Sequence, residues 1–130
     1  MADKAMNLAE HIRDTSTPER QMYEYDIPPK MAKTTGITSV GLVQLTADEE
    51  ITSAKRARND NMRLAYELVK ASLVAVNGKK VSLADGSADT AWNKMDPKVR
   101  ALVLQAYAEL HNAPEESVED FLASRKVKVG

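Results

Sequence analysis

The run "AWNKMDPKVRALVLQAYAEL" (residues 91–110) carries the strongest helix signal in the chain. Asp96 is a good N-cap, and Pro97 takes the first helical position, where its missing N–H costs nothing. Apolar side chains then recur at helical spacing: Val99, Leu102, Val103, Leu104, Ala106, Tyr107, Ala108 and Leu110. The apolar face is broad, so the sequence predicts a mostly buried helix over residues 97–111.

A second helix is predicted directly after it. Asn112 ends the first helix, and Pro114 begins the next, with Glu115 and Glu116 placing negative charge at its N-terminus. Its apolar residues are Val118, Phe121 and Leu122. Because the connection is short, we expect residues 97–111 and 114–124 to form a C-terminal helical hairpin.

Upstream, "LTADEE" predicts the start of another long helix. Thr46 and Glu49 have the spacing of a capping box, and the sequence predicts a helix from residue 46 to about residue 73. The run "KRARND" (residues 55–60) interrupts its apolar stripe with basic side chains. A solvated face is favoured over nucleic-acid contact there, because the run is short, flanked by acids and without aromatic residues.

Two segments carry β or turn signals around this helix. "ITSVGLVQL" (residues 37–45) is rich in β-branched residues and favours a short strand. Asn77-Gly78, between apolar arms in "LVAVNGKKVSL" (residues 73–83), predicts a β-hairpin. The polar run "ADGSADTA" (residues 84–91) is interpreted as a loop, since the ligand spacing of a calcium loop is missing.

The N-terminal part predicts an arm. Residues 3–13 fit a short amphipathic helix, and three prolines in residues 14–36 disfavour helix. Within this segment the apolar residues Met22, Tyr23, Tyr25 and Ile27 are expected to bind a neighbouring chain or the protein's own surface. The predicted organisation is residues 1–45 as a short helix and extended arm, and residues 46–130 as a helical domain.

The amino-acid composition limits which functions are compatible with the chain. The chain has 130 residues, enough for one domain, and 43% are hydrophobic. With 18 basic and 19 acidic residues there is no overall field to favour nucleic acid or a membrane surface as a partner. The absence of cysteine excludes disulfides and thiolate metal sites. Neither a signal-peptide pattern nor a membrane-spanning run is found, which favours a cytoplasmic protein.

Catalytic signatures are missing from the sequence. His11 and His111 lie in no metal-binding or nucleophile motif, and the glycines form no phosphate-binding loop. The acidic residues at helix starts have a sufficient explanation in the helix dipole. No cofactor, no metal and no catalytic residue are therefore expected. Trp92 and Phe121 are interpreted as core anchors rather than exposed binding residues.

The order "LTADEEI", a helix, "VNGKKV", a lone "W" and "MDPKVRALVLQAYAELHNAPEESVEDFLAS" resembles small phage tail assembly chaperones over residues 42–125. Such proteins are helical, are made in the host bacterial cytoplasm, and hold the tape measure protein while the tail tube polymerises. The resemblance implies a non-enzymatic function, with the tape measure protein as partner. Self-association is expected separately, through the apolar residues of the arm. It does not cover the arm of residues 15–45.

Three functions therefore stay open at this point. The first is a tail assembly chaperone, the second is a structural phage tail or baseplate subunit retained in the virion, and the third and least favoured is a small enzyme. The expected fold is mainly α: a small helical domain with a C-terminal helical hairpin, a short β-hairpin around Asn77-Gly78 and an extended N-terminal arm.

Overall fold

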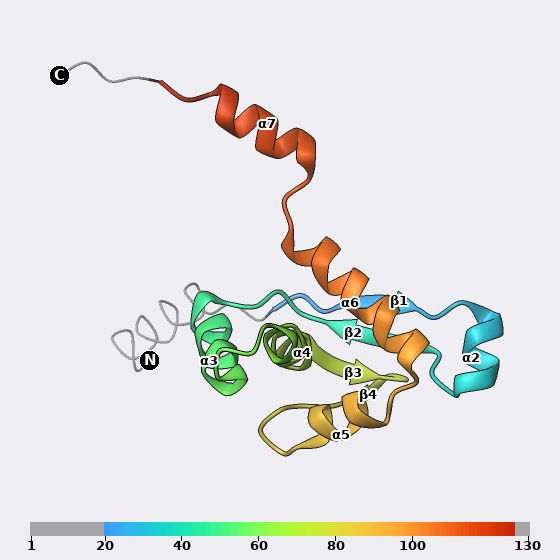
Figure 1. The fold of residues 1–130 in the computed structure, drawn as a ribbon. Coiled ribbons are helices and arrows are strands. Elements are labelled where there is room, and N and C mark those ends of the chain that lie inside the picture. The colour runs from blue at the N-terminus through green and yellow to red at the C-terminus, as the bar shows by residue number, and fades with distance from the viewer. Residues whose placement is uncertain (1–19, 127–130) are drawn as a thin grey trace, which may run out of the picture.

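A computed structural model describes residues 20–126, and the predicted helix over residues 3–13 lies outside this range. The elements are β1 (Tyr23–Asp26), α2 (Pro29–Thr35), β2 (Ser39–Leu42), α3 (Ala47–Ala57), α4 (Asn61–Ser72), β3 (Leu73–Val76), β4 (Lys79–Lys80), α5 (Ser87–Lys94), α6 (Pro97–His111) and α7 (Glu115–Ala123). Most of the described chain is helical, beside a small antiparallel sheet (Figure 1). The predicted fold class, mainly α, is confirmed.

Helix α6 has the bounds that the sequence predicts. The Asp96 carboxylate accepts a hydrogen bond from the backbone N–H of Lys98 at 2.8 Å, so it caps the helix as expected. Val99, Val103 and Ala106 are buried, and Leu102 and Tyr107 are partly buried beside them. The buried stripe is narrower than the predicted face, because the outer side of α6 is open to solvent.

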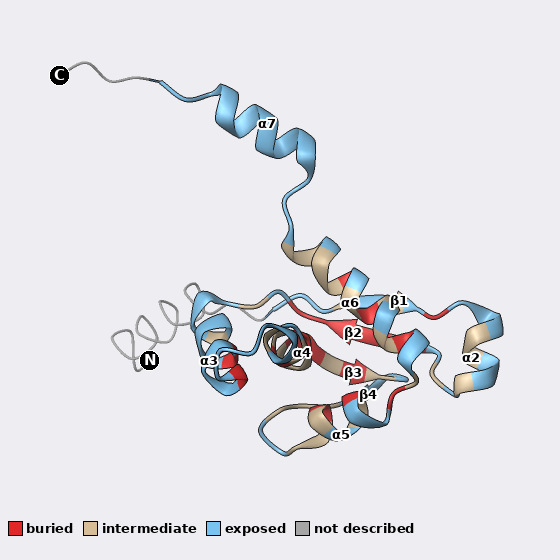
Figure 2. Cartoon of the chain, in the orientation of Figure 1, coloured by how far each residue is buried: buried red, intermediate tan, exposed pale blue. Residues whose placement is uncertain are grey.

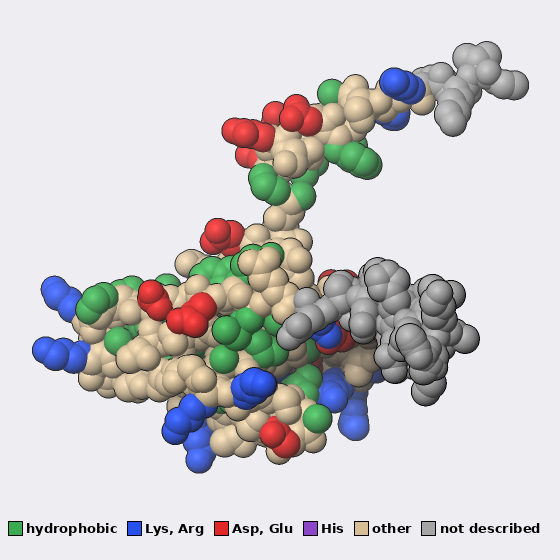
Figure 3. All heavy atoms as spheres, turned by 180° about the vertical axis from the view of Figure 1, so that it is seen from behind, with side chains coloured by type: hydrophobic (Ala, Val, Ile, Leu, Met, Phe, Trp, Pro, Cys, Tyr) green, Lys and Arg blue, Asp and Glu red, His purple; other side chains and the backbone are tan. Residues whose placement is uncertain are grey.

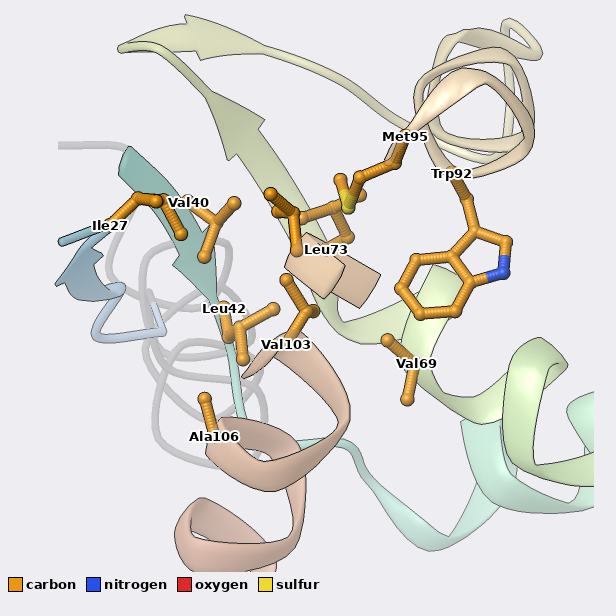
Figure 4. Close-up of a cluster of buried hydrophobic side chains, with 10 residues drawn as sticks. Ile27, Val40, Leu42, Val69, Leu73, Trp92, Met95, Val103 and Ala106 are labelled. Atoms are coloured by element: carbon orange, nitrogen blue, oxygen red, sulfur yellow. The ribbon is translucent and has the colours of Figure 1, made fainter. Parts of the chain in front are cut away.

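The core lies between the sheet and helices α4, α5 and α6 (Figures 2 and 4). Its buried members are Ile27, Val40, Leu42, Val69, Leu73, Trp92, Met95, Val99, Val103 and Ala106. Trp92 is 2% exposed and meets Tyr66 edge-on, with 5.5 Å between the ring centroids. The interpretation of Trp92 as a core anchor is confirmed. The same interpretation of Phe121 is wrong, because Phe121 is 75% exposed on a helix that the core does not reach.

The four strands pair in the order β1-β2-β3-β4, all antiparallel. Tyr25 pairs with Val40, and Val40 pairs with Val76, which places these three side chains on the core face. The predicted strand over residues 37–45 is confirmed in its central part, as β2. A register shift between Gly41 and Leu42 brings Leu42 opposite Leu73, so both leucines also enter the core.

The β-hairpin around Asn77-Gly78 is confirmed. Both residues have positive φ, 54° and 77°, the backbone that the tight hairpin turn requires. The Asn77 side chain also accepts a hydrogen bond from the backbone N–H of Thr38 at 2.7 Å and donates one to the Gly36 carbonyl at 2.9 Å. The turn is therefore tied to the α2–β2 connection as well as to its own strands.

Residues 20–45 do not form the extended arm that the prolines predict. They form a strand, a helix and a second strand, and β1 and β2 belong to the same sheet as β3. Pro28 and Pro29 begin α2 rather than prevent a helix, because proline fits the first positions of a helix. The predicted boundary at residue 45 therefore divides one sheet and one core.

The helix predicted from residue 46 to about residue 73 is two helices. The capping box of Thr46 and Glu49 is present at the start of α3. Arg58 and Asn59 then have left-handed backbones, with φ of 51° and 66°, and Asp60 caps α4 by accepting from the N–H groups of the next turn. Ser53 and Ala57 are buried where α3 packs on α4, because small side chains allow close approach.

The segment predicted as a loop over residues 84–91 contains the start of α5. Gly86 has a φ of 80° and directs the chain into the helix, where Ala88 and Trp92 are buried, and Met95 is buried directly after the helix ends. These three residues have the i, i+4, i+7 spacing of one helix face. The polar residues between them hid this pattern in the sequence.

The C-terminal helices form at the predicted places, but they do not pack as a hairpin. Helix α7 extends away from the body (Figure 1), and every described residue from 112 onward is exposed. The outward side of α6 explains this, because its residues Lys98, Gln105 and Glu109 are exposed and polar. They limit the apolar surface that α6 offers to α7, which consists of the exposed Ala101 and the half-buried Leu104 and Ala108.

Leucine truncation tests this assignment of core and surface. Leu42 has no exposed surface, so Leu42→Ala is expected to lower the free energy of unfolding by about 2–5 kcal/mol. Leu122 is 64% exposed, and Leu122→Ala should change the free energy of unfolding by less than about 0.5 kcal/mol. Urea unfolding followed by circular dichroism measures both; equal losses for the two variants would contradict the fold.

Candidate functional site

Helix α7 is the most unusual surface feature of the described chain. Phe121 is 75% exposed, Leu122 is 64% exposed and Val118 is 41% exposed. Figure 2 shows the whole of α7 as exposed, in contrast to the partly buried α6 that precedes it. Large apolar side chains on a projecting helix mark an interaction surface more often than a solvated one.

The sequence of α7 divides its surface into two sides. Val118, Phe121 and Leu122 stand at i, i+3 and i+4, so they form one apolar stripe. The acidic residues of the helix are Glu115, Glu116, Glu119 and Asp120. By helical periodicity they lie mainly on the side away from the stripe. The helix is therefore amphipathic, although no other part of residues 20–126 covers either side.

A small clasp fixes the point from which α7 departs. The backbone N–H of Leu45 donates to His111 Nε2 at 2.9 Å, and His111 Nδ1 lies 2.9 Å from the Tyr107 carbonyl. One neutral tautomer satisfies both contacts, with Nδ1–H donating and Nε2 accepting. Gln44 Nε2 also donates to the Leu110 carbonyl at 3.1 Å. These bonds hold the end of α6 against the connection between β2 and α3.

The aromatic ring of Tyr107 completes this clasp. It stacks on the His111 imidazole with 4.0 Å between the ring centroids. Burial, with a smaller contribution from the negative charge of Glu50, raises the pKa of the Tyr107 phenol. Tyr107 therefore acts as a partly buried packing residue. Together with the hydrogen bonds of His111 and Gln44, its stacking fixes the point at which the connection of residues 112–114 begins.

The predicted partner-binding residues Met22, Tyr23, Tyr25 and Ile27 serve largely within this chain. Tyr25 packs on the core from β1, and Ile27 is buried in it at 6% exposure. Tyr23 is half-buried on the same strand. Met22 remains 44% exposed, and its side chain lies close above Gly41. The surface that the sequence assigned to a partner is thus mostly occupied by the protein's own sheet.

The face of the sheet away from the core carries a hollow of about 550 Å³. Met22, Val74 and Ala75 give it apolar walls, and Glu24 and Lys80 supply charges. Figure 3 shows the molecule from behind, with hydrophobic side chains gathered on the body between acidic and basic ones, and with α7 standing apart. Because Met22 covers Gly41 here, its first role is to close the sheet surface.

A second hollow, of about 480 Å³, lies where α3, α4 and α5 meet. Lys70 Nζ lies 2.8 Å from Glu67 and 2.9 Å from Asp89, so one ammonium group bridges two carboxylates. Burial of Lys70 works to lower its pKa, but hydrogen bonds and charge attraction from both carboxylates outweigh it and raise the pKa above its ordinary value. The bridge joins α4 to α5, and the one positive charge of Lys70 offsets one of the two negative charges.

Neither hollow contains a cluster of metal-binding side chains. Among residues 20–126, no group of three or more histidine, cysteine, aspartate or glutamate side chains is placed to hold a metal ion. In that same range no helix combines the length and the apolar character needed to cross a bilayer. The arrangement is suited to binding through apolar and charged surfaces.

Phe121 and Leu122 are exposed candidate binding residues that the sequence reasoning missed. They were assigned to a helical hairpin because they have helical spacing. A signal was present, since the stripe of α7 has only three large apolar residues, too few to bury a helix firmly.

Comparison of the chain with known protein families, curated proteins and solved structures gives no match. The likeness to tail assembly chaperones therefore rests on the sequence pattern of residues 42–125 alone.

The Lys70 bridge gives a quantitative prediction. Glu67 is 9% exposed, so Lys70→Met leaves a nearly buried carboxylate without its cation and should cost about 3 kcal/mol of unfolding free energy. In the double variant, Lys70→Met with Glu67→Gln, the buried charge of Glu67 is absent, so most of the lost unfolding free energy should be regained. Urea unfolding of the wild type, both single variants and the double variant forms the cycle; additive losses would contradict the bridge.

Proposed function

We propose that this chain is a non-enzymatic protein-binding protein that holds a partner through the apolar stripe of α7. The observation that carries the proposal is the exposure of Phe121 and Leu122 on a helix that the rest of residues 20–126 leaves uncovered. Burying a large apolar side chain contributes about 1.5–3 kcal/mol. The three residues of the stripe can therefore supply a specific but reversible contact.

The geometry fits a helical or grooved partner. A stripe of residues at i, i+3 and i+4 is the pattern by which an amphipathic helix enters an apolar groove or packs along another helix. The clasp at His111 fixes the start of the connection, while α7 itself stands clear of the body. A partner can thus approach the stripe without displacing any part of the core.

The specific partner we propose is a phage tape measure protein, with this chain as a tail assembly chaperone in the bacterial cytoplasm. This step is supported by the sequence resemblance, and an exposed apolar helix suits a protein that shields an elongated helical partner. A structural tail or baseplate subunit uses the same kind of stripe to attach to its neighbours. The two functions differ in whether the chain stays in the finished virion.

Substitution of the stripe tests the proposal. Phe121→Ser with Leu122→Ser should leave the urea midpoint nearly unchanged and weaken binding to a co-expressed tape measure protein by at least about tenfold, since most of the buried apolar area is lost. Co-elution in size-exclusion chromatography and titration calorimetry measure this effect. The matched control is Ile51→Ser with Met62→Ser, two other exposed apolar residues, which should bind as the wild type does.

Equal binding by the stripe variant and the control would reject α7 as the binding element. Mass spectrometry of purified virions then distinguishes the two phage functions. Absence of the chain from particles supports the chaperone, and a stoichiometric amount supports the structural subunit.

A further inference from the structure

The hollow where α3, α4 and α5 meet is strongly basic. It is lined by Thr52, Lys55, Arg56, Arg58, Arg63, Glu67, Lys70 and Asp89. Its two acids are already bonded to Lys70. No acidic side chain of residues 20–126 lies within ion-pair distance of Lys55, Arg56, Arg58 or Arg63.

These four cations are gathered by the sharp turn between α3 and α4. Arg58 and Asn59 have left-handed backbones, so the chain reverses within a few residues, and Arg63 of α4 lines the same hollow as Arg56 of α3. Gathering like charges is unfavourable without a counter-charge. The guanidinium groups present planar donor pairs that match carboxylates. The ligand that fits this hollow carries several negative charges on a rigid element.

Helix α7 is such an element. Its four acidic residues lie within two turns of helix, and the described chain gives them no basic partner. They face mainly away from the stripe of Val118, Phe121 and Leu122. A helix docked through its acidic side would therefore leave its apolar stripe open.

Within one chain, α7 makes no ion pair with this hollow among residues 20–126, and to reach the hollow it would have to pass the acidic start of α3. His111 holds the end of α6 beside Leu45, at the start of α3, and the connection to Glu115 spans at most about 14 Å. Near that point lie Asp48, Glu49 and Glu50, which repel the acidic first turn of α7. The basic hollow is at the other end of α3, about 16 Å away.

We propose that the acidic side of α7 docks in the basic hollow of a second copy of this chain. The contact is heterologous, so copies form either a closed ring or dimer or a longer series. Exposed ion pairs each contribute little, and we expect a dissociation constant on the order of 0.1–1 mM at low salt. Because the stripe stays open, self-association is compatible with the partner binding proposed above and does not depend on it.

Variants that reverse the charge of either the basic hollow or the acidic side of α7 test this inference. Sedimentation velocity of the full chain at about 1 mM should show self-association at low salt and monomer in 0.5 M NaCl, where charges are screened over a few ångströms. Arg56→Glu with Arg63→Glu, and separately Glu119→Lys with Asp120→Lys, should each give a monomer at low salt. An equimolar mixture of the two variants should associate again, because each supplies the surface that the other lacks.

The controls separate this proposal from folding and from partner binding. Both charge variants should unfold at wild-type urea concentrations, since all four residues are exposed. The stripe variant Phe121→Ser with Leu122→Ser should self-associate as the wild type does. A monomeric wild type at low salt, or a mixture that stays monomeric, overturns the proposal. Tight binding of a single-stranded oligonucleotide to the hollow, unaffected by the α7 variant, would instead identify a nucleic-acid site and also overturn it.

Discussion

The packing of α6 against the sheet is the interaction on which the rest of the structure depends. Val99 and Val103 are buried with Leu42 and Leu73, and they close the space between the strands and the other helices. A single helix of fifteen residues thus joins β2, β3, α4 and α5 into one core. Removing any one of these contacts opens a cavity that the small domain cannot easily refill.

The same packing determines which surfaces remain for binding. The buried side of α6 is used by the sheet, its outer side is polar, and the clasp at His111 holds its end near the start of α3. Helix α7 therefore leaves the body with its apolar stripe exposed. The acidic end of α3 and the basic hollow at its other end give the body two surfaces of opposite charge. An acidic helix is repelled by the acidic end of α3 and attracted by the basic hollow.

Local signals predicted the parts of the fold whose causes are local. The cap at Asp96, the capping box at Thr46 and Glu49 and the turn at Asn77-Gly78 each depend on a few neighbouring residues, and all three are present. The break in the long helix was also encoded locally, since Asn59 and Asp60 suit a left-handed turn followed by an N-cap. It was missed because apolar spacing continued across it. Helix α5 was missed for the opposite reason, because polar residues lie between its buried residues in the sequence and interrupt the apolar pattern.

The sequence by itself determined the mainly helical class, the bounds of α6 and the hairpin turn, because helix periodicity, caps and positive φ act over short separations. Only the tertiary structure decided that Tyr25 and Ile27 belong to the core and that Phe121 and Leu122 do not. Both sets are apolar residues near prolines, and local pattern does not distinguish them. What separates them is whether an apolar surface distant in sequence lies within reach. The first set pairs with β2 and meets that surface, while the second follows a helix whose outer side is polar.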